Sequence, residues 1–366
     1  MTENTDQLLD TITRVVPALL TALEAFDQVQ ANLHPPQLPE LMNFLQPFAD
    51  TLQAEHDYFS NVEFPADARH IREVIGQANG YCLRACDSLS QAAASAGSDF
   101  GAVMRAMRAH ARAQEYIYGL AGPLSPVSQY FLEPAAREDH ELIRALAAPQ
   151  GAMKTGIISA GNDRSERGGF SVYVPENLLP QQPAPVVMVL HGGTGHGADF
   201  LWSWLREART RGFILVAPTS IGETWSINEE DVDLQHLLRV LRFVQQEWSV
   251  DSGRIMLAGM SDGATFSLIA GLNANSPFTH LAPFSGVLHP ELALLDRLQY
   301  ARNKPIYLVH GTRDWMFPVE IALMAEQQLN AAGASLTYRQ IEGLSHQFAR
   351  REIPALMDWF RATEAH

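Results

Sequence analysis

Apolar residues in the first part of the chain recur at helical spacing. Between residues 8 and 26 they fall one, three or four positions apart, which is typical of an amphipathic helix. Pro17 lies inside this pattern, so we expect it to kink the helix or restart it. Similar patterns predict helices that open near Pro39, near Pro65 and near Phe100, although Pro47 weakens the second. Residues 1–150 are therefore predicted to form a helical bundle domain.

From about residue 153 the pattern changes to short apolar runs separated by amphipathic stretches. Residues 170–174 alternate between apolar and polar, as in a strand with one exposed face. Continuous apolar runs, which suit strands buried on both faces, follow at 186–190, 213–217, 255–258 and 306–309. Helical patterns lie between them at about 199–211, 231–248, 264–272 and 319–332. This alternation predicts an α/β fold class for residues 151–366, with a mainly parallel sheet flanked by helices.

The clearest chemical motif is a glycine-flanked serine between a predicted strand and a predicted helix. Residues 259–263 read Gly-Met-Ser-Asp-Gly and fit the pattern G-x-S-x-G directly after the run 255–258. A nucleophile at such a sharp turn needs small residues two positions to either side, where side chains would collide with backbone. We therefore predict that Ser261 is a nucleophile. The alternative is a glycine-rich turn with an incidental serine.

A serine hydroxyl needs a base within hydrogen-bond reach and an acid that orients the base. Asp314 follows the run 306–309, and His346 follows a further expected strand at 336–341. The chain order Ser261, Asp314, His346 is that of α/β hydrolases. We predict His346 as general base and then acid, with Asp314 as its orienting partner. Glu342 is the rival acid, and the other histidines downstream of the serine are His280, His289 and His310.

Attack on a carbonyl also needs two donors for the oxyanion that forms. The backbone N–H of Asp262, directly after the serine, is expected to be one. The other is expected from the glycine-rich residues 191–197, where we choose Gly193 first and Thr194 second. A phosphate-binding loop is the competing interpretation, but the run lacks both a lysine at the required place and G-x-G-x-x-G spacing.

With these residues assigned, the chain resembles the α/β-hydrolase superfamily, in its branch of phospholipases/carboxylesterases and dienelactone-hydrolase-like serine esterases. The resemblance covers roughly residues 153–366 and rests on four motifs, which are HGG at 191, GMSDG around Ser261, HGTRDWMFP at 310–318 and GLSH ending at His346. It implies a covalent acyl-enzyme, no metal and no organic cofactor. Residues 1–150 have no counterpart in the compact members of the branch.

The resemblance also suggests where a substrate would bind. Trp225, in the segment 219–227, and Met316, close to the expected acid, are candidate substrate-binding residues, and the alternative for each is packing in the core. The expected substrate is a small-molecule or lipid-like carboxylic ester. A thioesterase, a peptidase of the same fold and a non-catalytic binding protein are the alternatives. Acyl-chain length, leaving group and acceptance of polymeric or aromatic esters stay open.

Charge and composition limit the partners. Lys and Arg total 26 against 41 Asp and Glu, so the formal net charge of -15 disfavours nucleic acid and anionic lipid surfaces. The N-terminus shows no secretory pattern, and no apolar run reaches the length of a membrane span. We therefore expect a cytoplasmic protein. For the helical domain we keep two hypotheses, a lid over the active site and a surface that pairs subunits into a homo-oligomer.

Overall fold

The computed structural model describes residues 3–95, 99–148, 153–227 and 231–363. The chain divides into two compact units, Met1–Ala147 and Ala148–His366. We describe each unit by itself and call the first the helical unit and the second the α/β unit.

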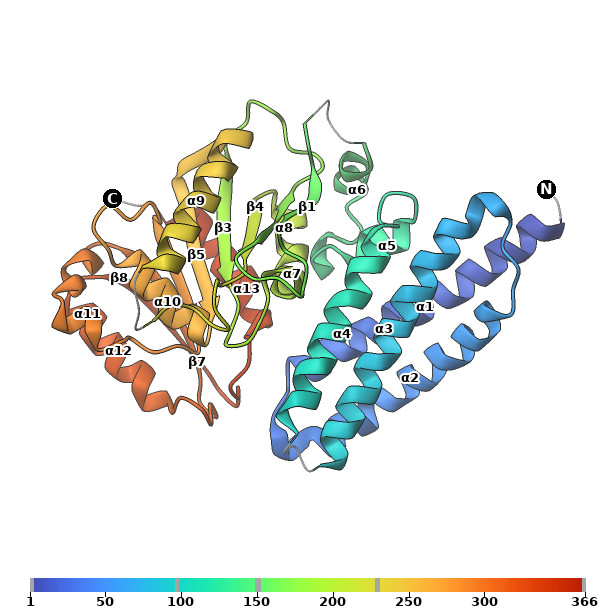
Figure 1. The fold of residues 1–366 in the computed structure, drawn as a ribbon, viewed down its shortest axis with the longest axis horizontal. Helices are drawn as coiled ribbons and strands as arrows, with labels where there is room; N and C mark the ends of the chain where they lie inside the picture. The colour runs from blue at the N-terminus through green and yellow to red at the C-terminus, as the bar shows by residue number, and fades with distance from the viewer. Residues whose placement is uncertain (1–2, 96–98, 149–152, 228–230, 364–366) are drawn as a thin grey trace. The chain divides into compact units, whose positions relative to one another are not determined.

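The helical unit is built around four long antiparallel helices (Figure 1). These are α1 (Glu3–Gln30), α2 (Leu38–Ser60), α3 (Arg69–Ala94) and α4 (Phe100–Tyr118), followed by the shorter α5 (Ser125–Tyr130) and α6 (His140–Ala147). Each long helix buries one apolar stripe in a common core, which explains the spacing seen in the sequence. Pro17 and Pro47 lie inside α1 and α2, so the helix that was expected to kink or restart at Pro17 is one continuous element.

The α/β unit is built on an eight-stranded sheet with strand order β1-β2-β4-β3-β5-β6-β7-β8. Strands β3 to β8 run parallel, while β1 and β2 are antiparallel to their neighbours. The strands are β1 (Gly156–Ala160), β2 (Phe170–Val174), β3 (Ala184–Leu190), β4 (Ile214–Pro218), β5 (Val250–Met260), β6 (His280–Phe284), β7 (Pro305–Gly311) and β8 (Ser335–Ile341). The predicted α/β fold class is thus confirmed, and the arrangement is that of an α/β hydrolase.

Helices cover both faces of this sheet (Figure 1). Helices α9 and α10 pack on one face, and α8 packs against α13 on the other. The helices are α7 (Gly197–Phe200), α8 (Leu205–Arg211), α9 (Val232–Glu247), α10 (Asp262–Gly271), α11 (Glu291–Leu294), α12 (Val319–Ala331) and α13 (Ile353–Ala362). Residues 186–190 of β3 and 255–259 of β5 are consequently buried on both faces, which accounts for the unbroken apolar runs there.

Two strands were not expected from the sequence, β1 at the sheet edge and β6 near its centre. The expected helix at 199–211 is divided into α7, a 3-10 turn over Leu201–Ser203, and α8. Within the described parts of the chain, no helix is both long enough and apolar enough to cross a membrane.

Candidate active site

Ser261 lies at a sharp turn between β5 and α10. Its backbone has φ 57° and ψ −119°, a conformation that is strained for a residue with a Cβ atom. Positions 259 and 263, two residues to either side, require glycine because neighbouring backbone atoms lie close to them. A Cβ atom on Gly259 would stand 2.2 Å from the carbonyl oxygen of Gly263, and one on Gly263 would stand 2.4 Å from that of Leu190. The motif therefore marks a turn that only this pattern of small residues permits.

A chain of hydrogen bonds leads from this serine to a buried carboxylate. His346 Nε2 lies 3.0 Å from Ser261 Oγ, and His346 Nδ1 lies 3.0 and 2.9 Å from the two carboxylate oxygens of Asp314. The Asp314 side chain is fully buried and that of His346 is 8% exposed. With an ionised Asp314, Nδ1 carries the proton and Nε2 is free to accept one from the serine. The structure thus brings the three predicted residues together.

The loop after β7 keeps Asp314 ionised. Its Oδ1 atom accepts the backbone N–H groups of Met316 at 3.0 Å and Phe317 at 2.8 Å. Burial by itself raises the pKa of Asp314, but the hydrogen bonds from His346 and from the Phe317 backbone, with the charges of His346 and His310, lower it below its ordinary value. The carboxylate is therefore available as a partner for His346 at neutral pH.

The alternative candidates for the base and the acid make other contacts or are exposed to solvent. His310 Nε2 donates to the Phe317 carbonyl at 2.8 Å and lies 3.4 Å from Asp314 Oδ2, so this histidine supports the acid's loop. His280 is fully buried, with Nε2 3.2 Å from the Thr363 carbonyl, and His289 lies beside Glu291. Glu342 is exposed. Of the candidate bases, His346 is the one whose ring lies within hydrogen-bond distance of the serine in the described structure.

The glycine-rich loop after β3, residues 191–197, adjoins Ser261, the predicted nucleophile. We call it the oxyanion loop, after its predicted role. A Cβ atom on Gly192 would stand 3.6 Å from Ser261 Cβ, and one on Gly193 would stand 2.7 Å from Asp262 Oδ2. The Asp262 N–H lies in the first turn of α10, where a helix offers it no acceptor. The N–H of Thr194, the second-choice donor, instead donates to the Glu223 carbonyl at 3.2 Å, because the loop turns through φ 56° there.

His191 and Trp225 hold the base of this loop. His191 Nε2 accepts a hydrogen bond from the Ser220 N–H at 3.1 Å. Nδ1 therefore carries the ring proton and donates to the Gly192 carbonyl at 2.7 Å. Burial lowers the pKa of His191 to about 3, and the nearby Arg167 adds to the effect. Trp225 is 2% exposed and donates its indole N–H to the His191 carbonyl at 2.8 Å. This leaves Trp225 little surface for contact with a substrate.

Aromatic and apolar side chains adjoin His346 after the acid. Met316, a predicted substrate-binding residue, is 41% exposed. Its neighbours Trp315, 51% exposed, and Phe317 pack edge-to-face with the His346 ring, with centroid distances of 6.2 and 5.3 Å. Sequence reasoning did not select Trp315 or Phe317, although the run Trp-Met-Phe directly after Asp314 was a usable signal.

The described residues also contain no group of three or more His, Cys, Asp or Glu side chains arranged to hold a metal ion.

Parts of this chain are similar to known proteins. Residues 220–363 match the family model described as Phospholipase/Carboxylesterase. The bifunctional acetylxylan esterase/xylanase XynS20E of Neocallimastix patriciarum is 31% identical over 149 residues, which are 39% of this chain and 21% of that protein. Acyl-protein thioesterase 1 of Gibberella zeae is 27% identical over 125 residues, 32% of this chain and 52% of that protein. The matched segment spans about half or less of these relatives' own length.

Among solved structures, this chain is similar to the Staphylococcus aureus fluorophosphonate-binding serine hydrolase FphF, with a TM-score of 0.48 and 16% identity. The match covers 57% of this chain and 100% of that one. Both the sheet order and the family match concern the α/β unit. The α/β unit thus has the sheet order expected of an α/β hydrolase, and its residues 220–363 match the Phospholipase/Carboxylesterase family model.

Proposed function

We propose that this protein is a serine ester hydrolase that acts through a covalent acyl-enzyme. The observation that carries the proposal is the hydrogen-bonded chain from Asp314 through His346 to Ser261, with Ser261 on a strained turn at the start of α10. Each group has the partner that its role requires, since the acid is ionised, the base is oriented and the nucleophile is in contact with the base.

In the acylation step, Ser261 Oγ attacks the ester carbonyl while His346 Nε2 takes the hydroxyl proton. The carbonyl oxygen becomes an oxyanion, for which the N–H groups of Gly193 and Asp262 are the proposed donors. The tetrahedral intermediate collapses, His346 returns its proton to the leaving alcohol oxygen, and the acyl group stays on Ser261. A water molecule, deprotonated by His346, then attacks the acyl-enzyme and releases the carboxylic acid.

The proposed substrate is a carboxylic ester that is small or lipid-like. Sequence similarity to an acetylxylan esterase supports an oxygen ester. Sequence similarity to acyl-protein thioesterases favours a thioester as the second candidate. Both pass through the same oxyanion, so the triad does not separate them. The net charge of -15 disfavours leaving groups that carry several phosphates, such as coenzyme A.

Hydrolysis of matched oxygen esters and thioesters by the purified protein tests this function. A p-nitrophenyl series from acetate to palmitate gives the chain-length profile, and p-nitrothiophenyl esters with the same acyl groups compare the two leaving atoms. Ser261→Ala should abolish turnover of both series. The matched control is Ser267→Ala, since Ser267 is a buried serine on α10 whose hydroxyl bonds to the Ala264 carbonyl. Equal activity of wild type and Ser261→Ala would reject the proposal.

For the helical unit we propose a role as a lid or as a pairing surface. Light scattering on the full chain separates the two, because a monomer rules out pairing. A chain beginning at Ala148 then tests the lid, which predicts altered acyl-length selectivity with the oligomeric state unchanged. A cytoplasmic location remains part of the proposal.

A further inference from the structure

Arg167 connects the oxyanion loop to two other segments of the α/β unit. It lies in the connection between β1 and β2, and its guanidinium donates to three carbonyl oxygens. These belong to Gly195 of the oxyanion loop (2.7 Å from Nη1), Gly222 (2.9 Å from Nε) and Glu223 (3.1 Å from Nη2). Nη2 also donates to the hydroxyl of Ser220. One side chain thus holds the oxyanion loop against the segment that follows β4.

The segment after β4 is itself fastened to the oxyanion loop. The Glu223 carbonyl that accepts from Arg167 also accepts the Thr194 N–H at 3.2 Å. Three residues earlier, the Ser220 N–H donates to His191. Arg167 therefore contacts both sides of a two-loop arrangement, and the carbonyl of Glu223 is shared between the arginine and the loop residue directly after Gly193.

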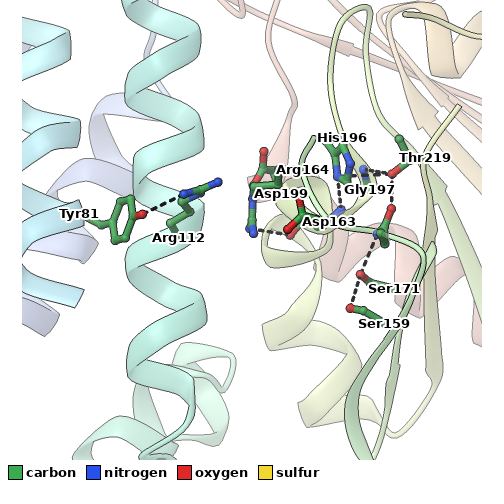
Figure 2. Close-up of polar contacts among 12 residues, drawn as sticks. Tyr81, Arg112, Ser159, Asp163, Arg164, Ser171, His196, Gly197, Asp199 and Thr219 are labelled. Carbon is green, nitrogen blue, oxygen red and sulfur yellow. Dashed lines mark hydrogen bonds and ion pairs between the residues drawn. The ribbon is translucent and has the colours of Figure 1, made fainter. Parts of the chain in front are cut away.

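The connection that carries Arg167 is anchored by a buried polar network (Figure 2). Asn162 donates to Ser171 Oγ at 2.8 Å and accepts from the Thr219 hydroxyl at 2.6 Å. Thr219 Oγ1 in turn accepts the backbone N–H of Gly197, at the end of the oxyanion loop, at 2.9 Å. Because Asn162 and Thr219 are at least nine-tenths buried, this network fixes the position of the segment from which Arg167 extends.

The contacts suit arginine and no other side chain. The four acceptors named above are oxygen atoms, and a guanidinium presents five N–H donors in one rigid plane without an acceptor of its own. A lysine ammonium carries the same charge but cannot reach separate carbonyls in a planar fork. Replacing arginine by lysine therefore keeps the charge and loses the geometry.

We infer that Arg167 is a positioning residue that holds the backbone of Gly193 and Thr194 in the shape needed to stabilise the oxyanion. The inference rests on the proposed function. The contacts described for Arg167 are with the oxyanion loop and the segment after β4, and it acts through the loop that adjoins Ser261. Its effect belongs to the transition state, in which the oxyanion forms, rather than to substrate binding.

Kinetics of Arg167→Ala and Arg167→Lys test this role on a p-nitrophenyl ester that the wild type hydrolyses. We expect kcat to fall roughly 10- to 100-fold in Arg167→Ala while KM stays within about 2-fold. Affinity for a trifluoromethyl ketone with the same acyl group, which forms an oxyanion on the serine, should fall by a similar factor. Arg167→Lys should recover little of the loss, and methylguanidinium added to Arg167→Ala should recover part of it.

The matched control is Arg164→Ala, which removes a guanidinium from the same connection. Arg164 pairs with Asp199 of α7 at 2.6 Å and donates to the Ala198 carbonyl, outside the oxyanion loop. We expect wild-type kcat and ketone affinity from it. Unchanged kcat in Arg167→Ala, full recovery by lysine, or equal losses in Arg164→Ala would overturn the inference.

Hydrogen exchange of the full-length variants gives a readout that needs no turnover. In Arg167→Ala the amides of the oxyanion loop should exchange faster than in wild type, whereas those of β3 and β5 should not change. If wild type hydrolyses no ester, the proposed function fails, and exchange still decides whether Arg167 orders this loop. Unchanged exchange in the loop would overturn the inference even if the esterase activity is established.

Discussion

The carboxylate of Asp262 stands directly beside Gly193, so close that a Cβ atom on the glycine would lie 2.7 Å from Oδ2. The hydroxyl of Thr224 donates to the same oxygen at 2.6 Å and holds it there. Asp262, which follows Ser261, and Gly193, the predicted oxyanion donor, are therefore in contact. A side chain at position 193 has to displace a carboxylate that is already bonded.

Gly193→Ala should lower kcat roughly 10- to 100-fold through this displacement, with a small change in stability, since the obstacle is the end of a side chain. Removing the obstacle in Gly193→Ala/Asp262→Ala should restore part of the activity relative to Gly193→Ala, which a double-mutant cycle measures. Gly122→Ala, where a Cβ atom meets nothing within 4 Å, is the control. Additive losses in the cycle would contradict the contact.

Asp314→Asn should reduce kcat by about 10³- to 10⁴-fold while leaving the site folded. The two backbone N–H groups that bond Oδ1 would keep the amide oxygen in that place and put the amide NH₂ opposite His346 Nδ1. The imidazole would then have to carry its proton on Nε2 and could not accept one from Ser261. Steady-state rates checked against circular dichroism test this, and near wild-type turnover would remove Asp314 from the mechanism.

Trp225→Phe should destabilise the α/β unit by about 1–2 kcal/mol, because the buried carbonyl of His191 loses its donor. Phenylalanine can still stack on Phe266, whose ring lies 5.5 Å from that of Trp225. Trp315→Phe, at a half-exposed position, should change stability by less than about 0.5 kcal/mol. Urea denaturation followed by circular dichroism compares them, and equal effects of the two variants would reject the structural role of Trp225.

Acid should destabilise the α/β unit well before its carboxylates titrate. Burial lowers the pKa of His191 from 6.5 to about 3 and that of His280 to about 4, so both stay neutral in the folded state while the unfolded chain takes up protons below about pH 6.5. The contribution of these two histidines to the unfolding free energy should therefore be constant above pH 7. It should fall between about pH 6 and 4 by up to about 2.7 kcal/mol per pH unit for two protons.

Tryptophan emission in urea at several pH values measures this, because all six tryptophans of the chain lie in the α/β unit. His280→Gln should reduce the number of protons taken up on unfolding by about one, which makes the slope of the unfolding free energy against pH shallower. A stability that rises as the pH falls from 6.5 to 4 would contradict the assignment.

The strands that were best predicted from the sequence are those buried on both faces of the sheet. The runs at 186–190 and 255–258 are β3 and the end of β5, where every side chain meets a helix or another strand. Strand β6 gave no such signal, since its five residues include Pro283, which cannot donate to a ladder, and His280, whose ring bonds to Thr363. Strand β1 is short and half-exposed at the edge, so its two isoleucines form no distinct pattern.

In the helical unit, packing overrode a local preference. The first helix was expected to kink or restart at Pro17; it does not restart there, and fully buried side chains on both sides of the proline, including Val15 and Leu19, hold α1 as one element.

The candidate triad could be chosen from the sequence because each member lies within a few residues of the end of a strand, in a fixed chain order. The structure brings the three residues into hydrogen-bond contact, and their catalytic roles remain a prediction to be tested. The contacts of Arg167 could not have been predicted. Three of its acceptors are backbone carbonyls, which every residue carries, so nothing in the residue types marks Gly195, Gly222 or Glu223 as its partners.

The turn at Ser261 has a consequence for the stability of the whole α/β unit. Ser261, a residue with a side chain, is held at φ 57° and ψ −119°, a backbone conformation that only glycine adopts without strain. The packing of the surrounding sheet and helix supplies the free energy that keeps it there. The protein is thus less stable than the same fold would be with glycine at this position. Selection for the proposed nucleophile and selection for stability therefore act in opposite directions on this one residue.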